Sequence, residues 1–237
     1  MTHFSADILA WNPSLGISVQ EHSRLLDKFF GFEVEQIENE LLRKAKVILP
    51  DGNHKIWGHS LHDGQQTWVG LDLQTLQTPY HELVEICNFI RPLHSSHVID
   101  LGAGYGRLGL VLSLLFPDVR FLGLEFVPER VQEGSRIYSL FNCSNAKLIQ
   151  QDLSDEKFML PIAEYYFIYD YGNLAEIRNT LKQLEGIVHQ KKFKVIARGK
   201  GVRSLIQYEH PWLSQVFAPS HFENYSIYSM SLDLQDI

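Results

Sequence analysis

The sequence predicts a doubly wound α/β fold with a mostly parallel sheet, preceded by a helical N-terminal extension. Short apolar strands alternate with helical stretches from residue 76 onward, which is the pattern of βαβ units. A glycine-rich turn follows the first clear strand, and doubly wound sheets bind ligands at the carboxyl ends of their strands. We therefore expect residues 1–75 to form a helical segment covering the cleft, and residues 76–237 to form the ligand-binding domain.

Two helices are expected in the N-terminal segment. Residues 18–30 and 33–45 have helical spacing, and Gly31 separates them. The apolar face of the second helix consists of Val34, Ile37, Leu41 and Leu42. A polar connection follows over residues 50–67, and its candidate metal ligands are His54, His59, His62 and Asp63. Because this connection has no cysteine and no helical pair of histidines, we expect a surface loop and no metal site.

From residue 76 onward, apolar runs between turn signals delimit the elements. We expect helices at residues 79–90, 106–116, 128–141 and 174–186. We expect parallel strands at residues 97–101, 120–124, 147–150, 165–169 and 194–197. Residues 224–230 alternate as a half-buried antiparallel strand does. Thr78 is a candidate N-cap for the first helix, and the last helix has an apolar face of Leu174, Ile177, Leu181 and Leu184.

Composition narrows the class of protein. The 237 residues are 45% hydrophobic and 21% charged, with a formal net charge of −7, which fits one sizeable core. The negative charge disfavours broad binding to nucleic-acid phosphates. Cys87 and Cys143 lie in apolar helical patterns, which predicts buried free thiols. Since the sequence shows neither a signal peptide nor an apolar stretch of membrane-spanning length, we expect a cytoplasmic protein without a membrane partner.

The turn after the first strand contains Gly102, Gly104 and Gly106, which let a ligand approach the main chain closely. A dinucleotide site would place its third glycine where this chain has Arg107. Asp100, two residues before the first glycine, would repel a pyrophosphate. It suits a ligand with an ammonium group and no phosphate, a description that S-adenosylmethionine meets.

The segment from Asp100 to Gly106 resembles motif I of the class I S-adenosylmethionine-dependent methyltransferases. The resemblance extends over about residues 76–197 and implies a seven-stranded sheet, S-adenosyl-L-methionine as cofactor and methyl transfer as the activity. It also implies that the cofactor contacts the turn, through Asp100, Gly102, Ala103, Gly104, Tyr105 and Gly106.

Acids end the next two strands. Glu125 lies where such a fold accepts hydrogen bonds from both ribose hydroxyls. Phe126 has two open roles, which are to cover one face of the adenine or to pack in the core. The resemblance places Asp152, followed by Leu153, near the adenine amino group, and a cap in the following loop is the alternative role for Asp152. Arg107 and Arg130 are expected to form structural salt bridges with nearby acids.

The phrase Thr78-Pro79-Tyr80 resembles one in non-SET protein-lysine methyltransferases, where it folds over the methionine end of the cofactor. The resemblance implies that Thr78 and Tyr80 contact the cofactor and that the methyl acceptor is a protein lysine. A small molecule is the alternative acceptor. The alternative to cofactor binding is that Thr78 and Pro79 only begin the helix expected at residues 79–90.

Asp170 and Tyr171 follow the fourth strand, beside the expected position of the methyl group. Asp170 is a candidate to contact the cofactor and to accept a hydrogen bond from the acceptor, and Tyr171 is a candidate for an aromatic channel. Capping and packing are the competing roles. Two other classes of protein stay open, a non-catalytic cofactor-binding module and a dinucleotide oxidoreductase, the latter disfavoured by Asp100 and Arg107.

Overall fold

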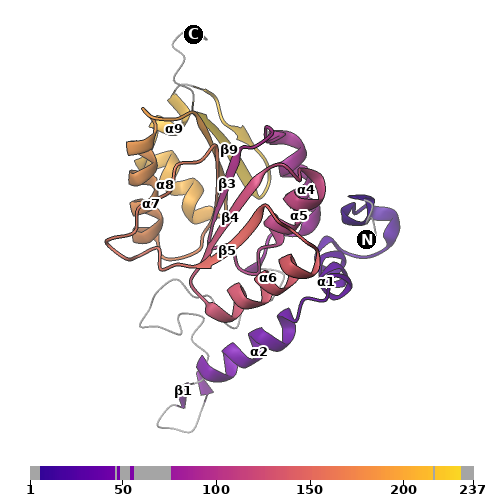
Figure 1. Cartoon of the computed structure of the whole chain (residues 1–237). Coiled ribbons are helices and arrows are strands. Elements are labelled where there is room, and N and C mark those ends of the chain that lie inside the picture. The colour runs from indigo at the N-terminus through magenta and orange to yellow at the C-terminus, as the bar shows by residue number, and fades with distance from the viewer. Residues whose placement is uncertain (1–5, 46, 49–53, 56–75, 216, 231–237) are drawn as a thin grey trace.

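The computed structural model describes residues 6–45, 47–48, 54–55, 76–215 and 217–230. Its centre is a seven-stranded sheet in the order β5-β4-β3-β6-β7-β9-β8, shown between helices in Figure 1. The strands are β3 (His97–Leu101), β4 (Arg120–Glu125), β5 (Ala146–Gln150), β6 (Tyr165–Tyr169), β7 (Phe193–Arg198), β8 (Ser220–His221) and β9 (Tyr225–Met230). The first five are parallel, whereas β9 runs antiparallel to both β7 and β8. The predicted doubly wound, mostly parallel sheet with a helical N-terminal extension is confirmed.

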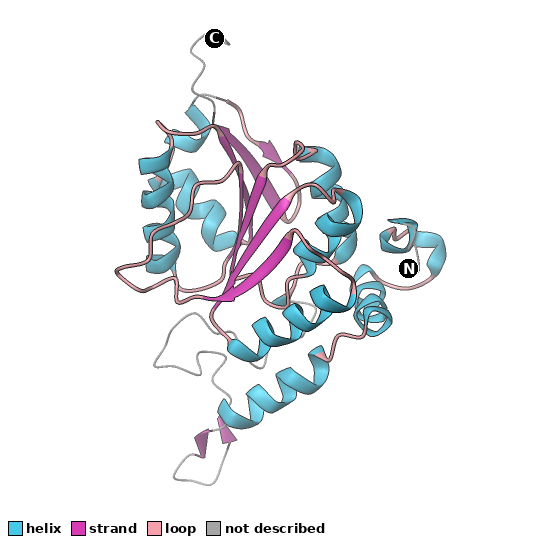
Figure 2. Cartoon of the chain, viewed as in Figure 1, coloured by secondary structure: helices cyan, strands magenta, loops and turns pink. Residues whose placement is uncertain are grey.

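Helices cover both faces of the sheet, as the colours of Figure 2 show. One face carries α4 (Tyr80–Ile90), α5 (Arg107–Leu115) and α6 (Pro128–Leu140), and the other carries α7 (Leu174–Ile187), α8 (Lys200–Glu209) and α9 (Trp212–Gln215). Strand β6 shows why the sheet needs both layers. Its residues alternate between the two hydrophobic cores, and Tyr165 to Ile168 are all buried. A strand that is apolar on both sides is stable only when both sides are covered.

The chain reverses direction across the sheet beside β3. From β3 it proceeds to β4 and β5 on one side, and it then crosses back to β6 on the other side. The chain therefore leaves the carboxyl ends of β3 and β6 toward opposite sides of the sheet. This switch point is where ligands bind in open α/β sheets.

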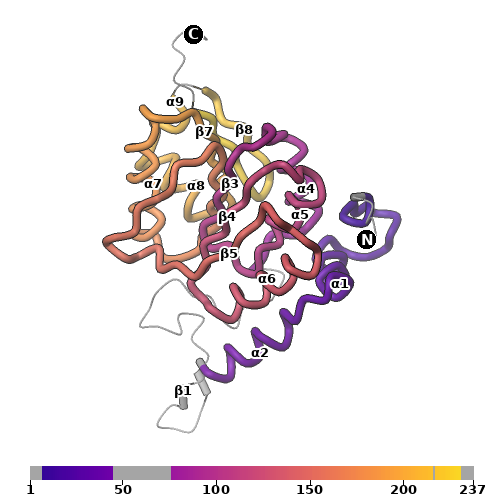
Figure 3. Tube along the Cα trace, in the orientation of Figure 1, coloured from indigo at the N-terminus to yellow at the C-terminus, as the bar shows by residue number. Residues whose placement is uncertain are grey.

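The N-terminal segment packs against the α4–α6 layer. It consists of the short turns η1 (Ala6–Leu9) and η2 (Pro13–Leu15), then α1 (Val19–Phe30) and α2 (Val34–Ala45). Ser18 caps α1 by accepting a hydrogen bond from the Glu21 amide, and Gly31, with φ of +78°, ends the helix in the left-handed conformation. Leu26 and Phe30 join the same core as α4 and α5. Figure 3 shows α2 running along the outer side of α6.

A buried ion pair fixes α1 to the sheet domain. The carboxylate of Asp27 accepts hydrogen bonds from Nε of Arg107 at 2.9 Å and from the Tyr80 hydroxyl at 3.0 Å, and it also pairs with Nη2 of Arg107. The guanidinium group lies over the Tyr80 ring, 4.9 Å from its centroid. Asp27 and Arg107 are both almost fully buried. The predicted structural salt bridge of Arg107 is therefore confirmed, and it joins two segments that are far apart in the sequence.

Several expected details are wrong. Thr78 does not cap α4, because the helix begins at Tyr80 with Pro79 in the N-cap position and no side-chain capping bond. Leu174 does not share the buried face of α7, since it is 52% exposed in the first turn of the helix. The sequence patterns did not predict the helices α8 and α9, the short strand β8 or the antiparallel pair β1 (Val47–Ile48) and β2 (His54–Lys55).

The expected burial of the two thiols is confirmed. Cys87 and Cys143 are buried free thiols. The predicted loop residues His59, His62 and Asp63 lie outside the described residues, and no group of three metal-binding side chains occurs among the residues that the structure describes. In the described part of the chain, no helix combines the length and apolarity required to cross a membrane.

Candidate functional site

The glycine turn between β3 and α5 is fixed to the sheet, and at Gly104 no described residue fills the space beside it. The amides of Gly102 and Ala103 both donate to the carbonyl of Leu124, which ties the turn to β4. All three glycines have positive φ, with values of 77°, 57° and 74° in chain order. A Cβ on Gly102 would collide with Tyr171, and one on Gly106 would collide with the Tyr138 hydroxyl. A Cβ on Gly104 would meet no atom of the described residues within 4 Å, so these residues leave space open along the main chain there.

The carboxylate of Glu125 borders this turn at the end of β4. Its Oε2 accepts a hydrogen bond from the Gly104 amide at 2.8 Å, and its Oε1 accepts one from the Val127 amide at 2.9 Å. Glu125 is 4% exposed, and Nη1 of Arg130 lies 3.8 Å from its Oε1. An ionised carboxylate offers about four acceptor positions, so each oxygen retains capacity for a further donor. The main chain thus fixes the orientation of an acid that can still accept two hydroxyl groups.

Asp100 supplies a second carboxylate, one residue before the end of β3. Burial of its carboxyl group, together with repulsion from Glu125, raises the pKa from the ordinary value of 3.8 to about 7. No cation forms an ion pair with Asp100 among the described residues. The two neighbouring carboxylates of Asp100 and Glu125 make this edge of the sheet more favourable for a cation than for a phosphate.

Sequence comparisons and structural comparisons gave different results. No protein-family model and no curated protein matches the chain. Precorrin-6y C5,15-methyltransferase from Geobacter metallireducens GS-15 is similar in structure, with a TM-score of 0.51 and 16% identity over 66% of this chain and 90% of that chain. The similarity to this structure, together with the observed strand order, identifies the fold. The chain has the class I methyltransferase fold.

Two other solved structures are similar at lower scores. An RNA methyltransferase from Salinibacter ruber in complex with S-adenosyl-L-homocysteine has a TM-score of 0.49 and 14% identity over 68% of this chain and 97% of that chain. PKMT2 from Rickettsia typhi in complex with AdoHcy has a TM-score of 0.39 and 18% identity over 45% of this chain and 21% of that chain. At such identities, similarity of structure speaks for the fold alone.

Three further predicted residues lie along the same edge of the class I fold. Phe126 is partly buried and packs beside Val127 and Leu41 of α2. Oδ1 of Asp152 accepts hydrogen bonds from the amide and the hydroxyl of Ser154, at 2.8 and 2.6 Å. Leu153 is buried in the core on the α7 side. Asp152 therefore caps a local turn, and the adenine contacts of these three residues stay predictions.

Two predicted cofactor residues have enclosed side chains. Tyr80 is 0% exposed, and both its amide and its hydroxyl are bonded to α1, through Ser23 and Asp27. Tyr105 is 2% exposed, and its hydroxyl donates to Glu38 of α2. Any contact that Tyr105 makes with a ligand is therefore through its main chain. The Thr78 side chain makes no capping bond, but its carbonyl accepts a hydrogen bond from Nη1 of Arg107 at 3.3 Å.

The two candidate catalytic residues are both held by the scaffold. The Asp170 carboxylate accepts hydrogen bonds from the amides of Gly201 at 3.0 Å and Val202 at 2.8 Å, which caps the N-terminus of α8. Tyr171 is buried, and its hydroxyl lies 2.6 Å from Oγ1 of Thr180. Its Cβ also packs against Gly102 of the turn. The geometry supports a capping role for Asp170 and a packing role for Tyr171, while their catalytic roles stay predictions.

Sequence reasoning missed one member of this region, Glu38. It is buried on α2 and bonded to both Tyr105 and Arg130, which confirms the predicted salt bridge of Arg130. A signal was available, because Glu38 follows Val34 by four residues and precedes Leu41 by three, which places an acid within the apolar face of the helix. A buried acid in such a face needs a partner.

Proposed function

We propose that this protein is an S-adenosylmethionine-dependent methyltransferase that binds its cofactor at the carboxyl ends of β3 and β4. The open side of Gly104, between the carboxylates of Asp100 and Glu125, carries this proposal. Two acids beside an open main-chain turn fit a ligand with hydroxyl and ammonium groups and no phosphate. The space beside Gly104 lets a ligand approach the main chain of the turn closely.

A dinucleotide fits the same site poorly. Its pyrophosphate would lie against the turn and close to the carboxylate of Asp100. Arg107, at the start of the following helix, cannot offset this repulsion because its guanidinium group is committed to Asp27 on the other side of α5. Asp100, which repels a pyrophosphate, and Arg107, which is already paired, therefore both disfavour a dinucleotide oxidoreductase.

The residues around the turn have defined tasks in this proposal. When bound, the cofactor supplies an electrophilic methyl group on a good leaving group. Glu125 accepts the ribose hydroxyls, and Asp100 favours the cationic end of the ligand. The remaining task of the protein is to align the acceptor with the methyl group and to exclude water, which accounts for much of the rate of such displacements.

The methyl acceptor is the second part of the proposal. The resemblance of the phrase at residues 78–80 to lysine methyltransferases favours a protein lysine, and a small molecule is the alternative. Incubating the protein with methyl-labelled cofactor and a cell lysate tests both. We expect the label on a protein band. Label confined to small molecules would refute the lysine acceptor, and tight cofactor binding without any label would indicate a non-catalytic module.

Asp100 makes the affinity for the cofactor depend on pH. Because a cation binds the ionised carboxylate better, we expect S-adenosylhomocysteine to bind about tenfold more tightly as pH rises through about 7. Asp100→Asn should weaken binding at alkaline pH and remove this dependence. Calorimetric titration of both proteins on either side of neutrality measures the effect, and an unchanged pH dependence in the variant would contradict the assignment.

The raised pKa of Asp100 also makes the free energy of unfolding of the cofactor-free protein depend on pH. A raised pKa means that folded Asp100 holds its proton more tightly than the unfolded chain does. The contribution of this group to the free energy of unfolding therefore decreases as pH rises between about 4 and about 7. In the Asp100→Asn variant, this contribution to the pH dependence of the free energy of unfolding should be absent.

A further inference from the structure

One buried carboxylate of the N-terminal segment holds two parts of the proposed cofactor site. Glu38 on α2 is 5% exposed. Its Oε1 accepts hydrogen bonds from the Tyr105 hydroxyl and from Nε of Arg130, both at 2.8 Å, and its Oε2 accepts one from Nη2 of Arg130 at 3.1 Å. Tyr105 lies between Gly104 and Gly106, so Glu38 is bonded directly to the side chain at the centre of the glycine turn.

Arg130 extends this network to the acid at the end of β4. Its Nη1 lies 3.8 Å from Oε1 of Glu125. The other oxygen of Glu125, Oε2, accepts a hydrogen bond from the Gly104 amide. Burial opposes the charge on Arg130, but the carboxylates of Glu125 and Glu38 outweigh this and raise its pKa. The guanidinium group of Arg130 therefore lies between two buried carboxylates. Its hydrogen bonds to Glu38 keep it from pairing more closely with Glu125.

We propose that Glu38 is a positioning residue of the cofactor site, acting through Arg130 on Glu125 and through Tyr105 on the turn; this inference rests on the proposed function. Without the negative charge of Glu38, Arg130 pairs more closely with Glu125. This pairing draws the carboxylate away from the Gly104 amide and from the ribose hydroxyls. Helix α2 is thereby part of the cofactor site, although it precedes the glycine turn by more than fifty residues.

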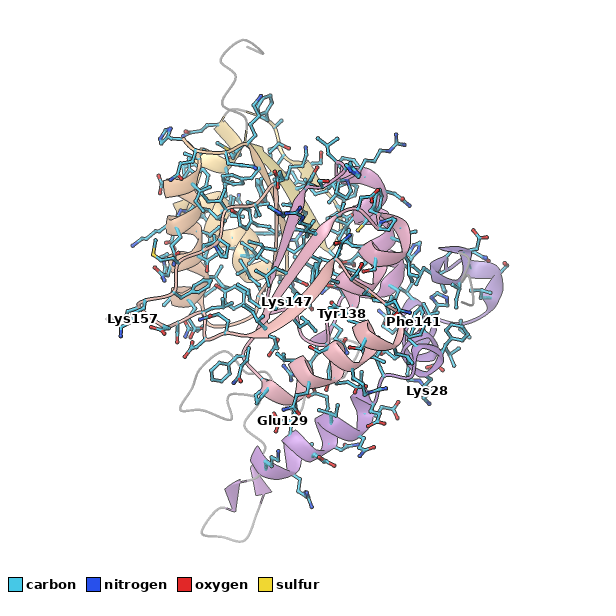
Figure 4. The ribbon with its side chains drawn as sticks, viewed as in Figure 1. Lys28, Glu129, Tyr138, Phe141, Lys147 and Lys157 are labelled. Carbon is cyan, nitrogen blue, oxygen red and sulfur yellow. The ribbon has the colours of Figure 1, made fainter. Side chains whose placement is uncertain are left out.

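The neighbouring Glu133 provides a matched control. It is also 5% exposed, and it also joins the N-terminal segment to α6, because its Oε1 accepts the Glu33 amide at 2.7 Å and its Oε2 pairs with Nε of Arg136 at 2.8 Å. Among the residues that the structure describes, Glu133 forms no hydrogen bond or ion pair with Glu125 or with the glycine turn. Figure 4 labels Glu129 at the start of the same helix, on the side that faces α2. Its carboxylate pairs with Nζ of Lys44 on α2 at 2.6 Å.

The test compares Glu38→Gln with Glu133→Gln in the full-length protein. We expect Glu38→Gln to weaken binding of S-adenosylhomocysteine about tenfold, and Glu133→Gln to change it less than about twofold, even if both lower the melting temperature. In a Glu125→Gln background, Glu38→Gln should cause a smaller loss than it does alone, because only the route through Tyr105 then remains. Equal losses in the two single variants, or no loss in Glu38→Gln, would overturn the proposal.

A second measurement separates this inference from the proposed function. The backbone amide resonance of Gly104, recorded by NMR without a cofactor, should shift in Glu38→Gln and stay in place in Glu133→Gln. If the unaltered protein binds no S-adenosylhomocysteine, the proposed function is wrong. The Gly104 resonance still shows in that case whether Glu38 is coupled to the glycine turn. An unshifted Gly104 amide in Glu38→Gln would contradict the coupling whether or not the cofactor binds.

Discussion

Gly104→Asn is expected to reduce the affinity for S-adenosylhomocysteine at least about a hundredfold, equivalent to about 3 kcal/mol. The new side chain would enter the space that the structure leaves open beside the turn. Asparagine tolerates the left-handed backbone, with φ of +57° here, better than most residues, so the fold should survive. Calorimetric titration measures the affinity, and thermal unfolding checks the fold.

Gly16→Asn is the matched control for this change. Gly16 also has a positive φ, of 68°, and a Cβ there also meets no atom within 4 Å, but it lies at the end of η2 and outside the proposed cofactor site. Both variants should lose similar, small amounts of stability, and only Gly104→Asn should lose binding. Equal affinities in the two variants would mean that the cofactor does not lie along the turn.

Arg107→Met is expected to lower the free energy of unfolding by about 3–5 kcal/mol, because it leaves the Asp27 carboxylate buried without its partner. Replacing both members, as in Asp27→Leu with Arg107→Met, should cost less than either single change does, since no unpaired charge then remains in the core. Chemical denaturation of the two single variants and the double variant measures these differences.

An exposed ion pair supplies the control for that series. Arg178 and Glu209 join α7 to α8 with side chains 35% and 42% exposed, and they also form two hydrogen bonds. Arg178→Met should cost less than about 1 kcal/mol, because water screens this pair. A comparable loss in Arg107→Met and Arg178→Met would contradict the view that the buried pair anchors α1.

The parts of the fold that depend on local patterns were predictable from the sequence. Strands β3 and β6 were predicted with their observed bounds because each is a short apolar run between turn residues. The end of α1 was predicted because Gly31 is a strong signal for a left-handed cap. Thr78 was wrongly predicted as the N-cap of α4, because the residues before a helix do not reveal which of them adopts the N-cap geometry.

The site was predictable where its residues follow strands, and not where they depend on distant partners. Asp100 and Glu125 end neighbouring parallel strands, so the sequence alone indicated that they meet at one edge. The capping role of Asp170 depends on α8, which the sequence pattern did not reveal. Glu38 and Asp27 meet partners 53 to 92 residues away, and no local spacing encodes such contacts.

The most direct test of the cofactor assignment is calorimetric titration of the unaltered protein with S-adenosylhomocysteine and, separately, with NADH. The two carboxylates and the open turn at Gly104 predict micromolar or tighter binding of S-adenosylhomocysteine at mildly alkaline pH and no binding of NADH. Binding of NADH without binding of S-adenosylhomocysteine would contradict the account.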